Sequence, residues 1–371
     1  MLVLKKLDGF LKTIEVQKNW IFLLSLLLTV VAIFFAFPSY DGIIAHDWQP
    51  LFDKGAHPFD NGNFHPGSHA SKLTFRLVVP IIVHLANLSI TGCMLFFGLV
   101  GILNFYLVVR LAYKILDDKH AAAFIGLCTA FIYFGKCSFT EIRGLMFDGV
   151  CISFLLLALN TRIGIIRTLC IFLSAFTDER GLIASSLLVV YTFLDYPDKK
   201  PMQKLFNPQA LFIYLAWVCY FSVRIFLTRH FGLITDKGGT GIHELLNQIN
   251  NIPIGVWSAL EGLWILLIYS YLLLYRDKKF FDLFIYFCAS SLILLVGLAV
   301  IDITRSVVYI FPAVFIALKI IHKDPIGKLN FKRYLKYALI LCFLYPAYYT
   351  GGKSSIWWSY PLPIQALRFV H

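Results

Sequence analysis

The chain has few charged residues and no long polar stretch. Aspartate, glutamate, lysine and arginine make up 15% of its 371 residues, whereas 59% are hydrophobic, and the mean hydropathy is +0.74. A water-soluble domain of this length would need more charge to stay dissolved. No segment is polar enough to form a separate soluble domain. The composition therefore predicts a single transmembrane domain over residues 1–371.

Cysteine motifs and cleavage signals are also missing. The eight cysteines contain no CxxC pair or tight cluster and lie mostly in apolar runs, so we interpret them as buried hydrophobes rather than disulfides or metal ligands. The first apolar run, 20–37, is long for a signal peptide, and Pro38-Ser39-Tyr40 offers no A-x-A site. We expect this run to remain as the first span.

Apolar runs long enough to cross about 30 Å of hydrocarbon recur along the chain. They predict an all-α, polytopic transmembrane helix bundle of about eleven spans. The segment 72–90 is apolar too, but Lys72, Arg76, Pro80 and His84 interrupt it, so we interpret it as an amphipathic or re-entrant helix within an outer loop, 39–91. The expected spans are 19–38, 92–114, 121–137, 148–161, 165–177, 181–195, 207–228, 253–275, 280–300, 305–322 and 333–349.

The net charge of +12 is explained by topology rather than by a nucleic-acid partner. Most lysines and arginines fall in the short loops on one side of the expected spans, as the positive-inside rule requires. This places the N-terminus, 1–18, in the cytoplasm and the C-terminal tail, 350–371, on the outer side. The expected location is the inner (plasma) membrane of a bacterium.

Ionisable residues gather at the outer ends of the spans. A charge at membrane depth costs about 2.5–3.5 kcal/mol on insertion, so it usually faces a partner or a cavity. Pairing within each cluster would explain the charges one by one, but a shared outward cavity also explains why every cluster lies on the same side. The residues expected to line that cavity are Asp41, Arg76, Glu141, Arg143, Asp178 and Arg180. Others at similar depth are Asp148, Glu179, Arg224, Asp302 and Arg305.

The first outer loop contains the best candidate for a general base. Asp41 directly follows a rigid span that can fix its position, and Asp47 is the second choice. Capping of the next helix is the alternative role for Asp41. The loop's histidines could bind a divalent metal with the aspartates, but Pro66 and Gly67 prevent a helical H-x-x-x-H pair, so no cofactor is predicted. These histidines are His46, His57, His65 and His69.

This layout resembles the GT-C superfamily of membrane glycosyltransferases, whose members have a first span, an outer loop with an acidic residue and juxtamembrane helices, and then many spans. The resemblance covers roughly the first 200 residues. The chain departs from the better-known members in having no Asp-Asp or Asp-x-Asp in its first loop and no soluble C-terminal domain. The matching stretches are Asp41–Asp47, His65-Pro66, the run 73–89 with Arg76 and Pro80, Val108-Val109-Arg110, Glu141-Ile142-Arg143 before Asp148, and Asp178-Glu179-Arg180.

The resemblance implies transfer of a sugar from a polyprenyl-phosphate-linked donor to a glycan, lipid or protein acceptor at the outer face of the membrane. Asp41 or Asp47 would take the proton of the acceptor hydroxyl. Arginine suits the departing phosphate because its planar fork binds two oxygens. The residues implied in substrate binding are Arg76, Glu141, Arg143, Asp178, Glu179, Arg180 and Arg305. A lipid-linked glycan polymerase or ligase, and a transporter or flippase of such lipids, remain open as alternatives.

Overall fold

The computed structural model confirms that the fold is all-α. It describes residues 2–38, 43, 45–60, 70–141, 144–235, 240–344, 349–351, 354–356 and 359–370. Within these ranges the strands are only two or three residues long: β1 (Phe37–Pro38) pairs with β4 (Ser359–Tyr360), and β2 (Tyr349–Gly351) pairs with β3 (Ser354–Ile356), both antiparallel.

Five helical stretches of the described chain are long and apolar enough to cross a membrane. They are α5 (Ile90–Leu116), α12 (Pro208–Phe231), the stretch Ile249–Arg276 with α14 (Ile252–Leu260) and α15 (Trp264–Arg276), α16 (Phe280–Leu298), and the stretch Ile303–Lys323 with α17 (Ile303–Val307) and α18 (Pro312–Lys323). Shorter apolar helices are α2 (Trp20–Phe35), α8 (Asp148–Asn160) and α9 (Gly164–Thr177). This composition is that of a membrane protein, while the count of eleven spans stays a prediction.

The remaining helices connect or cover these stretches. They are α1 (Leu2–Glu15), α3 (Ala45–Ala56), α4 (Val78–Leu85), α6 (Lys119–Phe131), α7 (Tyr133–Lys136), α10 (Glu179–Phe193), α11 (Pro201–Leu205), α13 (Ile242–Asn247), α19 (Pro325–Leu344) and α20 (Leu362–Val370). Four 3-10 helices lie among the described residues: η2 (Ala70–Phe75), η3 (Ile249–Asn251), η4 (Glu261–Leu263) and η5 (Val308–Ile310).

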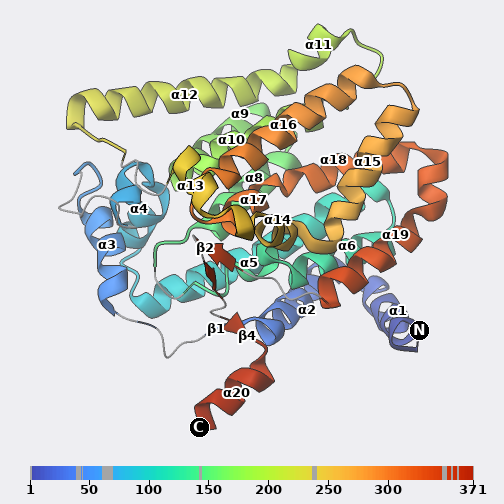
Figure 1. The fold of residues 1–371 in the computed structure, drawn as a ribbon, viewed down its shortest axis with the longest axis horizontal. Helices are drawn as coiled ribbons and strands as arrows, with labels where there is room; N and C mark the ends of the chain where they lie inside the picture. The colour runs from blue at the N-terminus through green and yellow to red at the C-terminus, as the bar shows by residue number, and fades with distance from the viewer. Residues whose placement is uncertain are drawn as a thin grey trace.

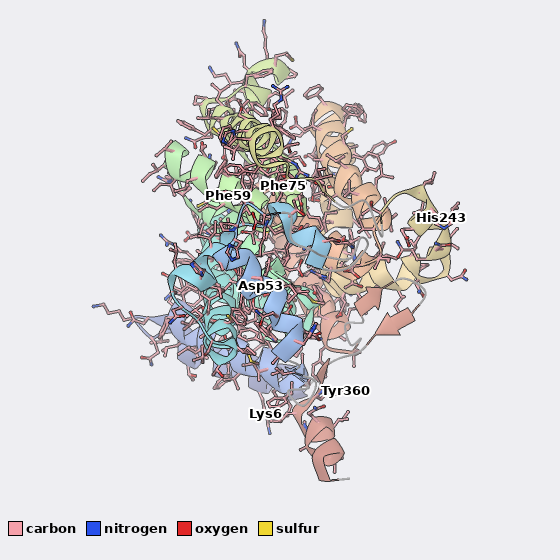
Figure 2. The ribbon with its side chains drawn as sticks, turned by 90° about the vertical axis from the view of Figure 1, so that its left-hand side faces the viewer. Lys6, Asp53, Phe59, Phe75, His243 and Tyr360 are labelled. Atoms are coloured by element: carbon pink, nitrogen blue, oxygen red, sulfur yellow. The ribbon has the colours of Figure 1, made fainter. Side chains whose placement is uncertain are left out.

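The segment 72–90 does not form one long helix. It contains η2 and then α4, which has 8 residues and is therefore about 12 Å long, well short of the hydrocarbon thickness. α4 packs against α3, and both lie at the left end of Figure 1, whereas α1 and α11 lie toward the right. Seen from that left end, Asp53 of α3, Phe59 just after it and Phe75 of η2 lie close together in the view (Figure 2).

The helices differ sharply in how deeply they are buried. In the apolar stretch of α17 and α18, 89% of the residues are buried, against 28% in α12 and in α16. α17 and α18 therefore form the centre of the bundle, while α12 runs along its upper edge in Figure 1. The exposed residues of α12 include Val218, Phe221 and Ile225. Apolar faces of this extent suit contact with lipid chains.

Candidate functional site

A cavity of about 320 Å³ opens where η2, the turn between α9 and α10, α12, α16 and α17 meet. Its lining is strongly charged. The basic residues are Lys72, Arg76, Arg180, Arg224 and Arg305, and the acidic ones are Asp178, Glu179 and Asp302. These residues lie far apart in the sequence, so the cavity exists only in the folded chain.

Asp178 holds the turn between α9 and α10 together. It is the N-cap of α10, and its Oδ1 accepts the backbone N–H of Arg180 at 3.0 Å, which satisfies a donor that the first helical turn leaves unpaired. The Arg180 side chain also donates to both Asp178 carboxylate oxygens, at 2.7 Å each. The turn can pack closely on α8 because residue 181 is glycine, where a Cβ would collide with Ser174 and Cys151.

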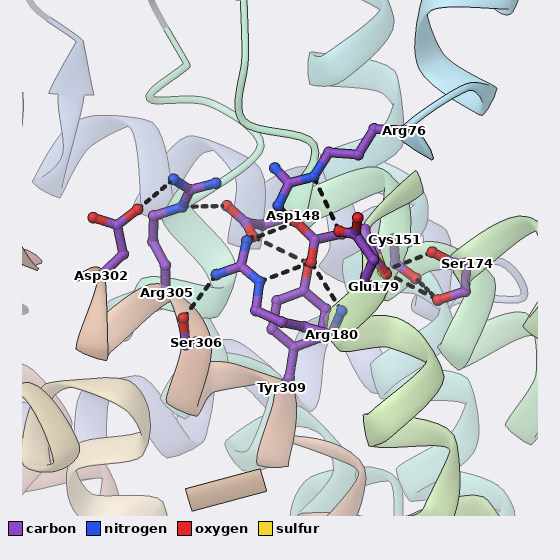
Figure 3. A network of polar contacts seen from close by, with 11 residues as sticks. Arg76, Asp148, Cys151, Ser174, Glu179, Arg180, Asp302, Arg305, Ser306 and Tyr309 are labelled. Atoms are coloured by element: carbon purple, nitrogen blue, oxygen red, sulfur yellow. Dashed lines mark hydrogen bonds and ion pairs between the residues drawn. The ribbon is translucent and has the colours of Figure 1, made fainter. Parts of the chain in front are cut away.

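Asp148, in the first turn of α8, lies at the centre of the polar network (Figure 3). It is 1% exposed. Its carboxylate accepts hydrogen bonds from Arg180 Nη2 at 3.0 Å, Arg305 Nε at 2.8 Å and Tyr309 Oη at 3.1 Å. A buried carboxylate is tolerated when several donors surround it, so Asp148 joins α8, α10 and α17 through its charge.

Arg76 brings the segment after η2 into the same network. Its Nη2 lies 3.0 Å from Asp178 Oδ2, and its Nε lies 3.3 Å from Glu179 Oε2. Burial alone would raise the pKa of the Asp178 carboxyl, but Arg180 and Arg76 together hold it below its usual value. Burial would likewise lower the pKa of Arg76, and the two carboxylates overcome it and raise that pKa. Both groups therefore stay ionised.

Two basic side chains of the lining form no ion pair with another described residue. Arg224 donates to the hydroxyls of Tyr220 and Thr235, and its guanidinium lies 4.1 Å from the centre of the Phe75 ring. Lys72 lies near Asp302, but burial lowers its pKa from the ordinary 10.5; Asp302 opposes this shift, and the neighbouring arginines reinforce it. The cavity thus has positive charge available for an anion.

The carboxylates of the cavity differ in their access to it. The side chains of Asp148 and Asp178 are at most 1% exposed, and each is surrounded by arginines. The side chain of Glu179 is 30% exposed and that of Asp302 is 13% exposed. Glu179 and Asp302 are therefore the carboxylates of the lining that a bound molecule can reach, and each also contacts an arginine: Glu179 lies 3.3 Å from Arg76, and Asp302 lies 2.9 Å from Arg305.

The structure brings together Arg76, Asp178, Glu179, Arg180 and Arg305, all expected from the sequence. Glu141 is buried, and it does not line this cavity. Asp47 lies in the first turn of α3, also outside the lining. Asp41 and Arg143 lie outside the described residues.

No family model, curated protein or solved structure matches this chain.

In the part of the chain that the structure describes, no group of three or more histidine, cysteine, aspartate or glutamate side chains is arranged to hold a metal ion. His46 lies on α3 and His57 follows it, whereas His65 and His69 lie outside the described residues.

Several residues of the site were not among the expected binding residues: Lys72, Asp148, Arg224, Asp302, Ser306 and Tyr309. Arg224 carried a signal, since an arginine two turns from the end of an apolar 24-residue helix usually faces a polar site. Ser306 and Tyr309 carried none, because a hydroxyl in an apolar helix is common wherever it points.

Proposed function

We propose that the protein is an integral membrane glycosyltransferase that moves a sugar from a polyprenyl-phosphate-linked donor to an acceptor hydroxyl at the outer face of the membrane. The observation that carries the proposal is the charged cavity beside apolar, lipid-facing helices. Arg224 and Lys72 supply positive charge that no described carboxylate neutralises by direct pairing. A phosphate attached to a lipid has the charge and the apolar chain that such a site would bind.

The lining of the cavity indicates where the lipid chain would lie. Beyond the charged residues it includes Ile183 of α10 and Val296 of α16. α12 and α16 both pack against α10, and both expose apolar side chains, such as Phe221 and Leu295. The polyprenyl chain would leave the cavity over α10 and run between α12 and α16 into the bilayer.

The reaction needs one base and one group of cations. We assign Asp302 as the base, because its side chain is 13% exposed and Arg305 Nη1, at 2.9 Å from its Oδ2, fixes its position. Asp302 would take the proton of the acceptor hydroxyl while the hydroxyl oxygen forms a bond to the anomeric carbon of the sugar. The bond from that carbon to the phosphate oxygen breaks, and its electron pair leaves with the polyprenyl phosphate, held by Arg224 and Lys72.

Sugar transfer with purified protein tests the proposal. A polyprenyl-phosphate sugar is supplied with candidate glycan, lipid and protein acceptors, and the released polyprenyl phosphate is measured. Transfer to a growing glycan would identify a lipid-linked glycan polymerase or ligase, which uses the same chemistry on another acceptor. Binding of the donor without release, together with its movement across proteoliposomes, would identify a transporter or flippase.

Substitution of Arg224 tests the phosphate contact. We expect Arg224→Met to weaken binding of farnesyl phosphate, a short polyprenyl phosphate, at least about tenfold, because a charge-assisted hydrogen bond contributes roughly 1.5–3 kcal/mol. Arg229→Met is the matched control, since Arg229 lies exposed in the last turn of the same helix. Equal binding by both variants would remove Arg224 from the donor site.

The lowered pKa of Lys72 predicts how binding depends on pH. A bound phosphate dianion stabilises the charged ammonium and so raises this pKa. The contribution of Lys72 to the affinity for farnesyl phosphate should therefore be constant at pH values below the pKa of Lys72 in the free protein and fall as the pH rises through it. Above about pH 8 the phosphate itself no longer titrates. Lys72→Met should bind more weakly and lose this alkaline decrease; a decrease that persists would assign it to another group.

Reporter fusions test the proposed orientation in the membrane. The charge pattern predicts that a reporter fused after Lys200 lies in the cytoplasm and one fused after Lys353 lies on the outer side. Paired alkaline phosphatase and green fluorescent protein fusions measure this. If both positions report the same side, the assignment of spans between them is wrong.

A further inference from the structure

A second cavity, of about 460 Å³, lies near the far end of α10 from the charged site. α10 has 15 residues, so its two ends are about 22 Å apart. The cavity is lined by the ends of α5 and α18, the connection between α8 and α9, and the last part of α10. Its charged lining residues are Lys114, Arg162, Arg167, Lys319 and Lys323, with His322, against the single carboxylate of Asp195.

The excess of basic over acidic side chains in this cavity is larger than the general excess of basic residues at that end of the molecule. A neighbouring cavity is lined by five lysines, of which Lys319 and Lys323 also line this one, but it contains three aspartates, and Lys204 pairs with Asp282 at 2.9 Å. Near α1, His120 and Lys336 are both within ion-pair distance of Asp8. A preference for basic loops accounts for the sign of the charge on this face but not for six basic side chains around one cavity with one carboxylate.

Some of these cations hold the fold together. Arg167 donates to the carbonyl oxygens of Ala158 at 3.0 Å and Thr161 at 2.8 Å, at the end of α8. Lys319 donates to Asp195 at 2.7 Å and to the Tyr191 carbonyl at 3.0 Å. They satisfy carbonyls that a helix end leaves unpaired. Their charges nevertheless contribute to the positive potential of the cavity.

Lys114 and Arg162 have no such structural partner. Both are exposed, and neither forms an ion pair with another described residue. Lys114 lies in the last turn of α5 and Arg162 in the connection between α8 and α9, and both line the same cavity. Their side chains are therefore available to a ligand, and Arg162 can bind two phosphate oxygens through its planar fork.

Apolar residues adjoin this cation pair. α9 begins two residues after Arg162, and Ile163, Ile165 and Ile166 are between 41% and 63% exposed. A ligand with phosphate in the cavity could lay hydrocarbon chains along this face. Basic pockets between transmembrane helices bind lipid headgroups in this way.

We propose that this second cavity binds the phosphate headgroup of an anionic lipid, with Lys114 and Arg162 as its direct ligands. Phosphatidic acid is the simplest lipid with this chemistry, because its phosphate monoester carries close to two negative charges at neutral pH. The site is separate from the proposed donor site and does not depend on the proposed function.

The test uses the full-length protein in nanodiscs of phosphatidylcholine with a minor fraction of phosphatidic acid. Native mass spectrometry of the released protein counts the retained phosphatidic acid. We expect the double variant Lys114→Ala, Arg162→Ala to retain at least about tenfold less than the wild type, as loss of two charge-assisted contacts implies. The matched control is Lys199→Ala, Lys200→Ala, which removes the same charge from exposed residues that do not line this cavity.

Further comparisons identify the site and the ligand. Arg224→Met, in the first cavity, should retain phosphatidic acid, so that failure of the donor site and failure of this site are distinguishable. Inorganic phosphate that displaces the lipid at similar concentration would identify a free-anion site of the same chemistry, whereas resistance to it supports a contribution from the chains. Equal retention by the double variant and its control, with unchanged thermal unfolding, would overturn the proposal.

Discussion

Replacing Asp148 by alanine should destabilise the folded protein by about 3–5 kcal/mol, the range for removing one partner of a buried ion pair. Asp148 accepts hydrogen bonds from two arginines and a tyrosine while it is 1% exposed. Without its carboxylate, the guanidinium of Arg305, whose side chain is 2% exposed, loses its 2.8 Å contact while it stays buried, with the ion pair to Asp302 at 2.9 Å remaining. The free energy of unfolding is measured by titration with sodium dodecyl sulfate in mixed micelles.

The matched control for this experiment is Asp277→Ala. Asp277 also pairs with an arginine, Arg276 at 2.8 Å, but the two side chains are 30% and 44% exposed. Exposed pairs of this kind contribute at most about 1 kcal/mol. If the two aspartate variants lose similar stability, the network around Asp148 does not hold the bundle together.

Replacing Asp302 by asparagine should lower the rate of sugar transfer at saturating donor at least about 100-fold, because a positioned general base contributes roughly 10²–10⁴-fold. The dissociation constant for the donor should change little, since asparagine keeps the shape of the side chain and an oxygen that can accept the hydrogen bond from Arg305 Nη1, and Arg305 keeps its contact with Asp148. The assay measures donor binding and sugar transfer separately, which distinguishes loss of chemistry from loss of binding.

Glu179→Gln is the comparison within the same cavity. Glu179 lies 3.3 Å from Arg76, so its loss should loosen that arginine and change binding more than the rate at saturation. Asp41→Asn is measured in parallel, because Asp41 is the base that the sequence favours. If Asp302→Asn is fully active and either Asp41→Asn or Glu179→Gln is inactive, the base is the residue whose substitution abolishes activity.

The helical architecture could be predicted because it depends on local properties of the chain. Apolar runs of the required length and the charges between them predicted helices that the structure has at nearly the same bounds, such as α5 (Ile90–Leu116) for 92–114 and α12 (Pro208–Phe231) for 207–228. The interruption of 72–90 by Arg76 and Pro80 also predicted its separation from the spans. Hydropathy predicts membrane helices well because backbone N–H and C=O groups inside a bilayer must form hydrogen bonds within their own helix.

The sequence also indicated which kind of residue would gather, since charges at membrane depth need a partner or a cavity. The sequence could not show which of these charged residues form ion pairs with one another. Asp148 and Asp178 are buried among arginines, whereas Glu179 and Asp302 each contact an arginine and are also partly exposed. This difference depends on side-chain directions across four chain segments.

By itself, then, the sequence determined that this is a helical membrane protein with its buried charges in a few clusters, because hydrophobicity and charge act through the composition of each segment. The tertiary structure alone decided that Arg76, Arg180 and Arg305 belong to one network and that Arg224 and Lys72 lie beside it without a direct ion pair to a described residue. It likewise decided that Lys114 and Arg162 meet at the other end. Such contacts depend on how the helices pack. Packing brings together residues that are far apart in the sequence, and their sequence separation does not predict their distance in space.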